Sequence, residues 1–254
     1  MTPDIRVNKN VLEGLTKLGV PYQILASSSE KTTQESLVQS GPEIIIPSDR
    51  WLIKVSHQGK AGIYELSQKM LPSMNFKDTI NYSINARTQG KFSPRDSRFN
   101  FSAFRSVVDS NSTQKDKIIS FLKNNLRKYF SLTTTLVVYN YNGNRNDKFV
   151  HDAGMKEQYE IPVKIIGPDQ EITSEDNSFL EAMVDCSDFE KVKRVTKVIN
   201  NTLTFIYRIN SAPKSCEKKV ARFGASSSWL FLGACRDLDC EDPSFGYKLV
   251  EQDK

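Results

Sequence analysis

The segment from Thr113 to Phe130 constrains the fold of this chain more than any other. Five apolar side chains recur at the spacing of one face of an α-helix: Ile118, Ile119, Leu122, Leu126 and Tyr129. Lysine and arginine fill most of the other positions, and Arg127 and Lys128 suit the negative end of a helix dipole. The sequence therefore predicts an amphipathic helix over residues 113–130, which needs an apolar surface to pack against.

A β-strand is predicted directly after this helix. Leu132–Tyr141 is rich in threonine, valine and tyrosine, and Asn142-Gly143 is typical of a tight turn. Other short runs bounded by turn residues also predict strands: Tyr22–Leu25, Glu43–Ile46, Arg50–Ser56, Ile63–Leu66, Tyr159–Ile166, Thr202–Ile209, Ser228–Arg236 and Phe245–Val250. Pro162 predicts that its strand lies at a sheet edge or carries a bulge. We expect the last three strands to form an antiparallel meander.

Two further helices are predicted. Val11–Leu18 has helical spacing, and Ser187-Asp188-Phe189-Glu190 has the pattern of a capping box that opens a helix through Asn200. The predicted elements do not alternate between strand and helix, which is the pattern typical of a parallel sheet. The predicted fold class is therefore α+β, a mainly antiparallel sheet with about three to four helices. We expect a single domain over residues 1–254, with the polar segment 143–152 as a possible subdivision.

The composition constrains the compartment more than the partner. No stretch approaches the roughly 20 apolar residues of a membrane helix, and the first ten residues lack the apolar core of a signal peptide. We therefore expect no membrane partner and a cytoplasmic location, or a virion assembled in the cytoplasm. The net charge of +5 permits an anionic partner but does not require one.

One segment carries the residue types of a nucleic-acid interface. Residues 87–105 read RTQGKFSPRDSRFNFSAFR, with a single acid, Asp96. Cations that follow phosphates and aromatic rings that stack on bases are the combination that binds single strands. The predicted contact residues are Arg87, Lys91, Phe92, Arg95, Arg98 and Arg105, extended by Lys193 and Lys197, which would share one helix face.

A competing interpretation places this segment in the core. Residues 85–105 show little periodicity and predict a long loop, with a strand at Arg98–Phe104. Strand alternation would turn Phe99 and Phe101 inward and leave the arginines at a solvated edge. Phe92, between Gly90 and Pro94, is the aromatic residue that we most expect to be exposed. The same residue types also suit a contact with another protein.

The sequence supports an enzyme less well than it supports a binding protein. The two histidines, His57 and His151, stand in unrelated sequence contexts, and no phosphate-binding glycine loop or nucleophile elbow is present. A metal-dependent nuclease would need two or three clustered acids and often a lysine. Acids cluster at Asp185, Asp188 and Glu190, with Lys191 beside them, and again at Asp237, Asp239, Glu241 and Asp242, which is typical of a solvated turn. We expect no cofactor. The four cysteines are best read as free thiols, although Cys235 and Cys240 are close enough in sequence to leave a metal site or a disulfide open.

Three hypotheses about function remain. The first is a non-catalytic nucleic-acid-binding component that uses a basic and aromatic surface. The second is a structural or assembly subunit of a viral or phage particle, or of another large complex, in which the same residues contact neighbouring subunits. The third is a metal-dependent nuclease. The sequence leaves the organism, the ligand and the oligomeric state open.

Overall fold

A computed structural model describes residues 4–6, 23–25, 43–45, 50–140 and 147–252. Near the N-terminus, β1 (Asp4–Arg6), β2 (Gln23–Leu25) and β3 (Glu43–Ile45) form an antiparallel sheet in the order β1-β3-β2. These agree with two predicted strands. The predicted helix at Val11–Leu18 lies outside the described residues.

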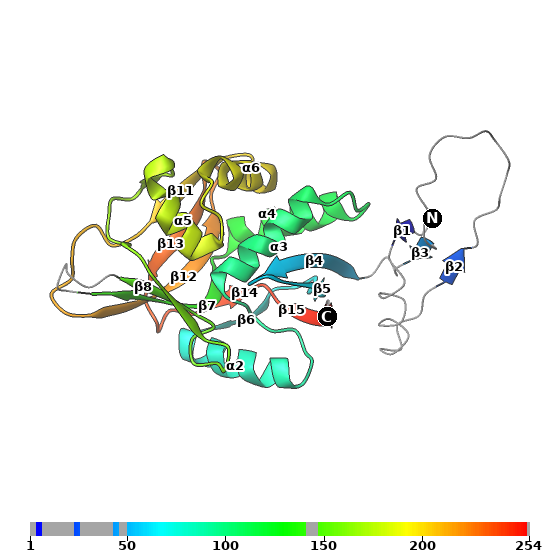
Figure 1. The fold of residues 1–254 in the computed structure, drawn as a ribbon, viewed down its shortest axis with the longest axis horizontal. Helices are drawn as coiled ribbons and strands as arrows, with labels where there is room; N and C mark the ends of the chain where they lie inside the picture. Colours follow the sequence, from blue (N-terminus) through cyan, green and yellow to red (C-terminus); the bar gives the residue numbers. More distant parts are fainter. Residues whose placement is uncertain (1–3, 7–22, 26–42, 46–49, 141–146, 253–254) are drawn as a thin grey trace.

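A seven-stranded sheet forms the centre of the fold (Figure 1). Its strands are β7 (Ser131–Tyr139), β8 (Lys148–His151), β9 (Tyr159–Pro162), β10 (Gln170–Glu171), β11 (Leu203–Tyr207), β12 (Glu217–Ala225) and β13 (Trp229–Arg236). Their order is β10-β11-β13-β12-β7-β8-β9, and every pair is antiparallel except β11 with β13. Pro162 lies in the edge strand β9, as predicted.

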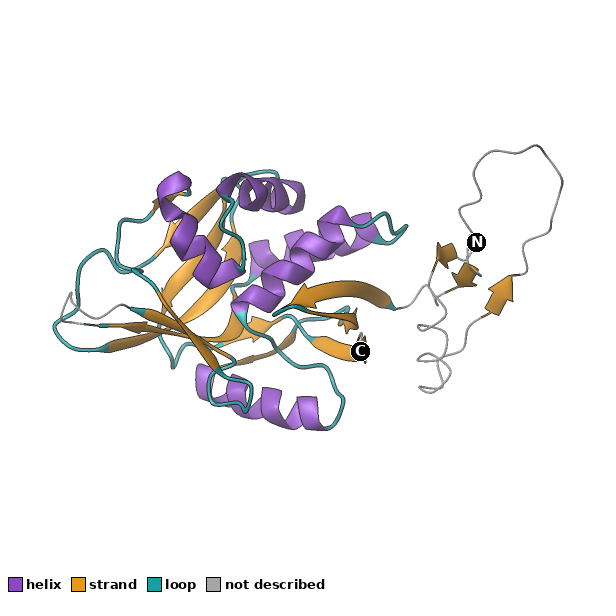
Figure 2. Ribbon diagram, viewed as in Figure 1, coloured by secondary structure: helices purple, strands orange, loops and turns teal. Residues whose placement is uncertain are grey.

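Helices cover the two faces of this sheet unequally (Figure 2). The described helices are α2 (Phe76–Thr88), α3 (Ser97–Asp109), α4 (Lys115–Lys128), α5 (Asn177–Val184) and α6 (Phe189–Asn200), with a 3-10 turn, η1, at Ser174–Asp176. Helices α3 to α6 lie over one face, here called the inner face. Helix α2 packs on the opposite, outer face, where Phe76 joins Val138 and Val150 in a separate core cluster.

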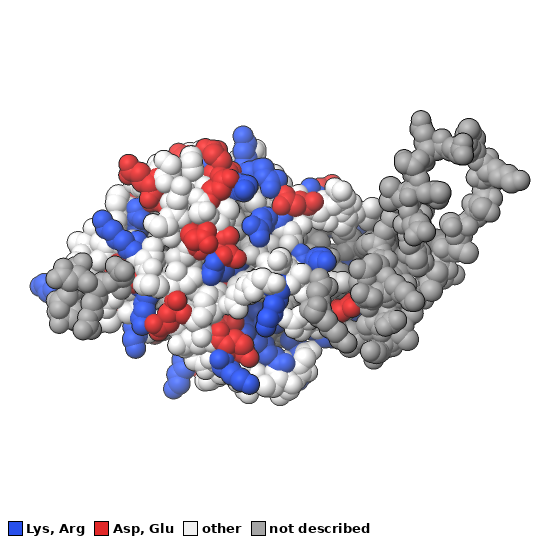
Figure 3. All heavy atoms as spheres, viewed as in Figure 1, with Lys and Arg blue, Asp and Glu red and all other residues white. Residues whose placement is uncertain are grey.

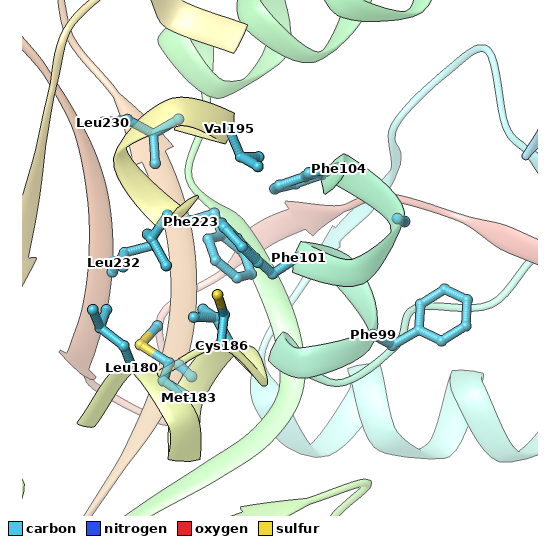
Figure 4. Close-up of a cluster of buried hydrophobic side chains, with 14 of the residues drawn as sticks. Phe99, Phe101, Phe104, Leu180, Met183, Cys186, Val195, Phe223, Leu230 and Leu232 are labelled. Carbon is cyan, nitrogen blue, oxygen red and sulfur yellow. The ribbon is translucent and has the colours of Figure 1, made fainter. Parts of the chain in front are cut away.

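Helix α3 occupies the position for which the sequence predicts a loop and a strand. Asp96 caps the helix by accepting a hydrogen bond from the Phe99 amide at 2.9 Å. Phe99, Phe101 and Phe104 are each at most 2% exposed. In Figure 4, Phe101 and Phe104 point toward the cluster that contains Phe223 and Val195, whereas Phe99 points away from it and contacts the rings of Tyr64 and Tyr247. The predicted strand at Arg98–Phe104 is therefore wrong. Phe101, Phe104 and Val108 do recur at helical spacing in α3, but Phe99 and Phe101 also alternate as in a strand, so the sequence pattern alone does not separate helix from strand here.

Shorter sheets complete the fold beside α3. Strands β4 (Trp51–His57) and β5 (Lys60–Leu66) form the predicted hairpin, whose turn residues Gln58 and Gly59 both have positive φ. Strand β15 (Tyr247–Gln252) extends this sheet by pairing with β5. Strand β6 (Leu71–Met74) pairs with β14 (Asp242–Ser244).

The α+β class with antiparallel-rich sheets agrees with the prediction, but the C-terminal strands differ in detail. Strands β11 and β13 are parallel neighbours, β12 adds a strand that the sequence analysis did not predict, and β15 belongs to another sheet. The predicted helix over 113–130 is confirmed as α4. Helix α6 is also confirmed, although Asp188 rather than Ser187 caps it, because the Asp188 carboxylate accepts from the amides of Glu190 and Lys191.

The sequence also predicts a possible subdivision at residues 143–152 and no membrane-spanning helix. Part of the proposed boundary at 143–152 is strand β8, which pairs with β7, while residues 141–146 lie outside the described part. Among the described helices, none is long and apolar enough to cross a membrane.

Candidate nucleic-acid interface

Strands β11 and β13 present aromatic rings on the outer face of the large sheet. Alternation buries Leu230 and Leu232 in the core and turns Trp229 and Phe231 to the other side. Strand β11 repeats this arrangement, with Phe205 and Tyr207 outward. Phe130, just before β7, joins them. We call these five residues the aromatic face: Phe130, Phe205, Tyr207, Trp229 and Phe231.

The rings of the aromatic face contact one another as a continuous group. Ring centroids are separated by 5.6 Å between Phe205 and Trp229, by 5.0 Å between Tyr207 and Phe231, and by 6.0 Å between Phe130 and Phe231. These separations are typical of packed aromatic pairs. Trp229 is 36% exposed and the adjacent Leu203 is 55% exposed, so this part of the sheet remains accessible.

Glycine and arginine shape the border of the aromatic face. A side chain at Gly224 would collide with the Phe130 ring, so glycine allows that ring to lie against β12. The Arg222 guanidinium lies over the same ring, 3.7 Å from its centroid. Asp242 lies 3.9 Å from Arg222 and binds Arg236 at 2.8 Å. Burial lowers the pKa of Arg222, and the nearby Arg236 lowers it further. The site thus combines stacking surfaces with a cation.

The predicted contact residues do not form one surface. Arg87 binds the Asp152 carboxylate with two hydrogen bonds of 2.9 and 2.7 Å, and Arg98 binds Asp185. Lys193 forms an ion pair with Glu171 at 3.1 Å. These three cations are engaged within the fold, so contact with a ligand would compete with their partners.

Arg95 is the most deeply placed of the predicted cations. Its guanidinium lies between the rings of Tyr64 and Phe99, at 5.5 and 5.3 Å from their centroids. Burial lowers its pKa to about 10, and the nearby Arg87 contributes in the same direction. Arg95 therefore supports the core beside α3.

The remaining predicted residues differ in exposure. Lys91 and Lys197 are exposed, and neither forms an ion pair with any described residue. Phe92 is half-buried beside Gly246, which corrects the expectation of an exposed ring. Arg105 is half-buried in α3 and lines a groove with Lys54 and Lys115. On the face drawn in Figure 3, basic and acidic side chains are interspersed, and no large area carries one sign alone.

The two histidines of the chain meet at one carboxylate, although the sequence places them in unrelated contexts. His57 Nε2 lies 3.3 Å from Asp96 Oδ2, and His151 Nδ1 lies 3.9 Å from Asp96 Oδ1. The His151 ring also contacts the Thr135 hydroxyl at 3.0 Å and the Ala182 carbonyl oxygen at 2.9 Å. The imidazoles thus connect the β4–β5 hairpin and β8 to the start of α3.

The surroundings of these groups shift their pKa values. Burial lowers the pKa of His151 to about 4, so the ring is neutral near pH 7. Burial alone would raise the pKa of Asp96, but His57, His151 and the Phe99 amide outweigh it and hold that pKa well below its usual range. Both ring nitrogens of His151 have partners inside the fold, and the ring is fully buried. This geometry gives His151 a structural role.

The acidic and thiol candidates also have local roles. Asp185 ends α5 in a left-handed conformation and binds Arg98, while Asp188 caps α6. Over the described ranges, no group of three or more histidine, cysteine or acidic side chains is arranged to hold a metal ion. All four cysteines are free thiols, of which Cys186 is buried and Cys216 is exposed.

Comparison of the chain with models of protein families, with curated proteins and with solved structures finds no match. The candidate interface therefore depends on its geometry alone.

Proposed function

We propose that this protein is a non-catalytic nucleic-acid-binding component that holds a single strand on its aromatic face. The observation that carries the proposal is the group of five contacting rings on an accessible part of a sheet. Aromatic side chains on an open sheet bind unpaired bases by stacking, which tolerates any sequence because every base has a π-face.

The charge of the protein supports this assignment. Arg222 lies at the border of the aromatic face, where its guanidinium would meet the backbone of a stacked strand. The net charge of +5 favours association with a polyanion. In this role the protein would act in the cytoplasm or in a virion, where it would meet unpaired nucleic acid.

Binding of a fluorescent single-stranded oligonucleotide, followed by anisotropy, tests the proposal. We expect saturable binding at low salt that weakens as salt rises, because phosphate contacts release counterions. Trp229→Ala and Phe231→Ala should each weaken binding roughly 5- to 150-fold, the equivalent of about 1–3 kcal/mol per stacked base. Val198→Ala, at a 43% exposed position on α6, is the control and should bind as the wild type does.

Two results would contradict the proposal. One is an absence of oligonucleotide binding even at low salt. The other is binding that Trp229→Ala and Phe231→Ala leave unchanged, which would place the contact elsewhere.

The second candidate function, a structural or assembly subunit, is favoured by one feature of the same face. Tryptophan, tyrosine and arginine dominate the energetics of protein interfaces, and all three occur here. Light scattering separates the candidates, because an assembly subunit should self-associate at high concentration and Trp229→Ala should reduce that association.

A further inference from the structure

A groove separates strand β4 from the turn between α3 and α4, away from the aromatic face. Its volume is about 460 Å³, which lies within the range of small-ligand sites. The polar side chains that line it are mostly cations and hydroxyls: Lys54, Arg105, Lys115, Ser106, Ser110 and Ser112. The groove borders the inner-face helices, so it is separated from the aromatic face by the large sheet.

Arg105 is the cation in the groove that is most available to an anionic ligand. It lies in the second half of α3, half-buried, and lines the groove. Carboxylates bind Arg87 and Arg98, whereas the Arg105 guanidinium forms neither an ion pair nor a hydrogen bond with any residue that the structure describes. A half-buried guanidinium without an anion retains its full capacity to bind one.

Lys115 and Asp109 determine which other charges the groove offers to a ligand. Lys115 Nζ donates one hydrogen bond, of 2.6 Å, to the Val108 carbonyl oxygen, which leaves two further donors on the ammonium group. Asp109 is the acidic residue that lines the groove, and Arg194 binds its carboxylate at 2.7 Å. Arg105 and Lys115 therefore line the groove without a carboxylate partner among the described residues.

The start of α4 adds donors to the same place. Ser110 and Ser112 accept hydrogen bonds from the amides of Ser112 and Gln114, so their hydroxyl hydrogens remain available to a ligand. Gln114 makes no side-chain cap, and α4 is 14 residues long, so the positive end of its dipole faces this region. These donors supplement the guanidinium of Arg105 and the ammonium of Lys115.

We propose that this groove binds a phosphate group. A planar guanidinium beside an ammonium and hydroxyl donors suits the several oxygens of a phosphate. The phosphate can come from a free phosphorylated molecule or from the end of a nucleic-acid strand. This phosphate site is independent of the aromatic face, because its residues belong to β4, α3, the turn between α3 and α4, and the start of α4, and none of them is part of that face.

Isothermal titration with inorganic phosphate, against sodium chloride at matched ionic strength, provides the test. The wild type should bind phosphate saturably, and Arg105→Gln should weaken binding at least tenfold. Arg105→Lys keeps the charge and should recover part of the affinity. Lys77→Ala, which removes an exposed lysine from α2, is the matched control and should bind as the wild type does.

Two results would contradict a phosphate site in this groove. An absence of saturable phosphate binding, or equal losses in Arg105→Gln and Lys77→Ala, would overturn the proposal. Lys115→Gln provides a second variant if Arg105→Gln fails to fold, as judged by circular dichroism, and it should also weaken binding.

Two oligonucleotides of one sequence, with and without a 5′-phosphate, identify the source. A preference for the phosphorylated strand that Arg105→Gln abolishes would assign the groove to a strand end. Phosphate binding without such a preference would assign it to a free phosphorylated molecule. Trp229→Ala should leave phosphate binding intact, so failure of the stacking proposal is distinguishable from failure of this one.

Discussion

The guanidinium of Arg222 lies over the ring of Phe130, 3.7 Å from its centroid, on the outer face of the large sheet. Gly224 makes this contact possible, because a side chain at that position would occupy the space of the ring. Phe130 in turn contacts Phe231, so one glycine determines how the border of the aromatic face is formed.

Gly224→Ala should therefore destabilise the protein by about 1–3 kcal/mol through overpacking, and it should weaken oligonucleotide binding by displacing Phe130. Urea unfolding and anisotropy measure the two effects. In the double variant Gly224→Ala with Phe130→Ala, the steric conflict is removed, so the cost of the glycine substitution should shrink. Additive losses in the double variant would show that Gly224 acts through another contact.

The stability of the protein should fall in acid because of His151. Its pKa is about 4 in the folded chain and near 6.5 when unfolded, so the unfolded state binds the proton more readily. The contribution is fully present above pH 6.5 and is lost progressively as the pH falls towards 4, by roughly 3 kcal/mol. The depressed pKa of Asp96 acts in the same direction at still lower pH.

Urea midpoints measured between pH 7 and pH 4 test this dependence. His151→Gln should be less stable at pH 7 but should show a flatter profile between pH 6.5 and 4, because the titrating group is gone. An unchanged slope in His151→Gln would assign the acid sensitivity to other groups.

Arg87 should matter for folding rather than for ligand binding. Its removal leaves the Asp152 carboxylate, which is only 10% exposed, without its cation. Breaking a buried ion pair in this way costs about 3–5 kcal/mol. Lys148→Ala breaks an exposed pair with Glu160 and should cost about 0–1 kcal/mol. Oligonucleotide affinity of folded Arg87→Ala should match that of the wild type, and a large loss would restore Arg87 as a contact residue.

The elements that follow from the sequence are those with one buried face. Helix α4 has an apolar stripe opposed by lysines, so its period of 3.6 is visible and its position is predicted. In α3, Phe101, Phe104 and Val108 follow a helical period, but Phe99 and Phe101 alternate as in a strand, and this ambiguity is why the sequence predicts a loop and a strand there. Strand β12 does not follow from the sequence because its first half, Glu217–Lys219, is charged.

The candidate site was missed for a related reason. Strands β11 and β13 were predicted, but both of their faces are apolar, so alternation did not separate the core face from the outer one. The distinction is between aliphatic and aromatic residues: Leu230 and Leu232 are buried, whereas Trp229 and Phe231 are not. Which face is covered depends on where α2 packs, and that contact joins residues distant in sequence.

Phe101 and Phe231 separate the two roles that phenylalanine has in this chain. Phe101 is 1% exposed in the core, so Phe101→Ala should destabilise the protein by about 3–5 kcal/mol. Phe231 is only partly buried on the outer face, where it contacts the rings of Tyr207 and Phe130, so Phe231→Ala should cost less in stability, about 1–2 kcal/mol. The order reverses for binding: folded Phe101→Ala should retain the oligonucleotide affinity of the wild type, whereas Phe231→Ala should lose it. Urea unfolding and anisotropy on the same two preparations test this reversal, and similar stability losses in both variants would show that Phe231 belongs to the core.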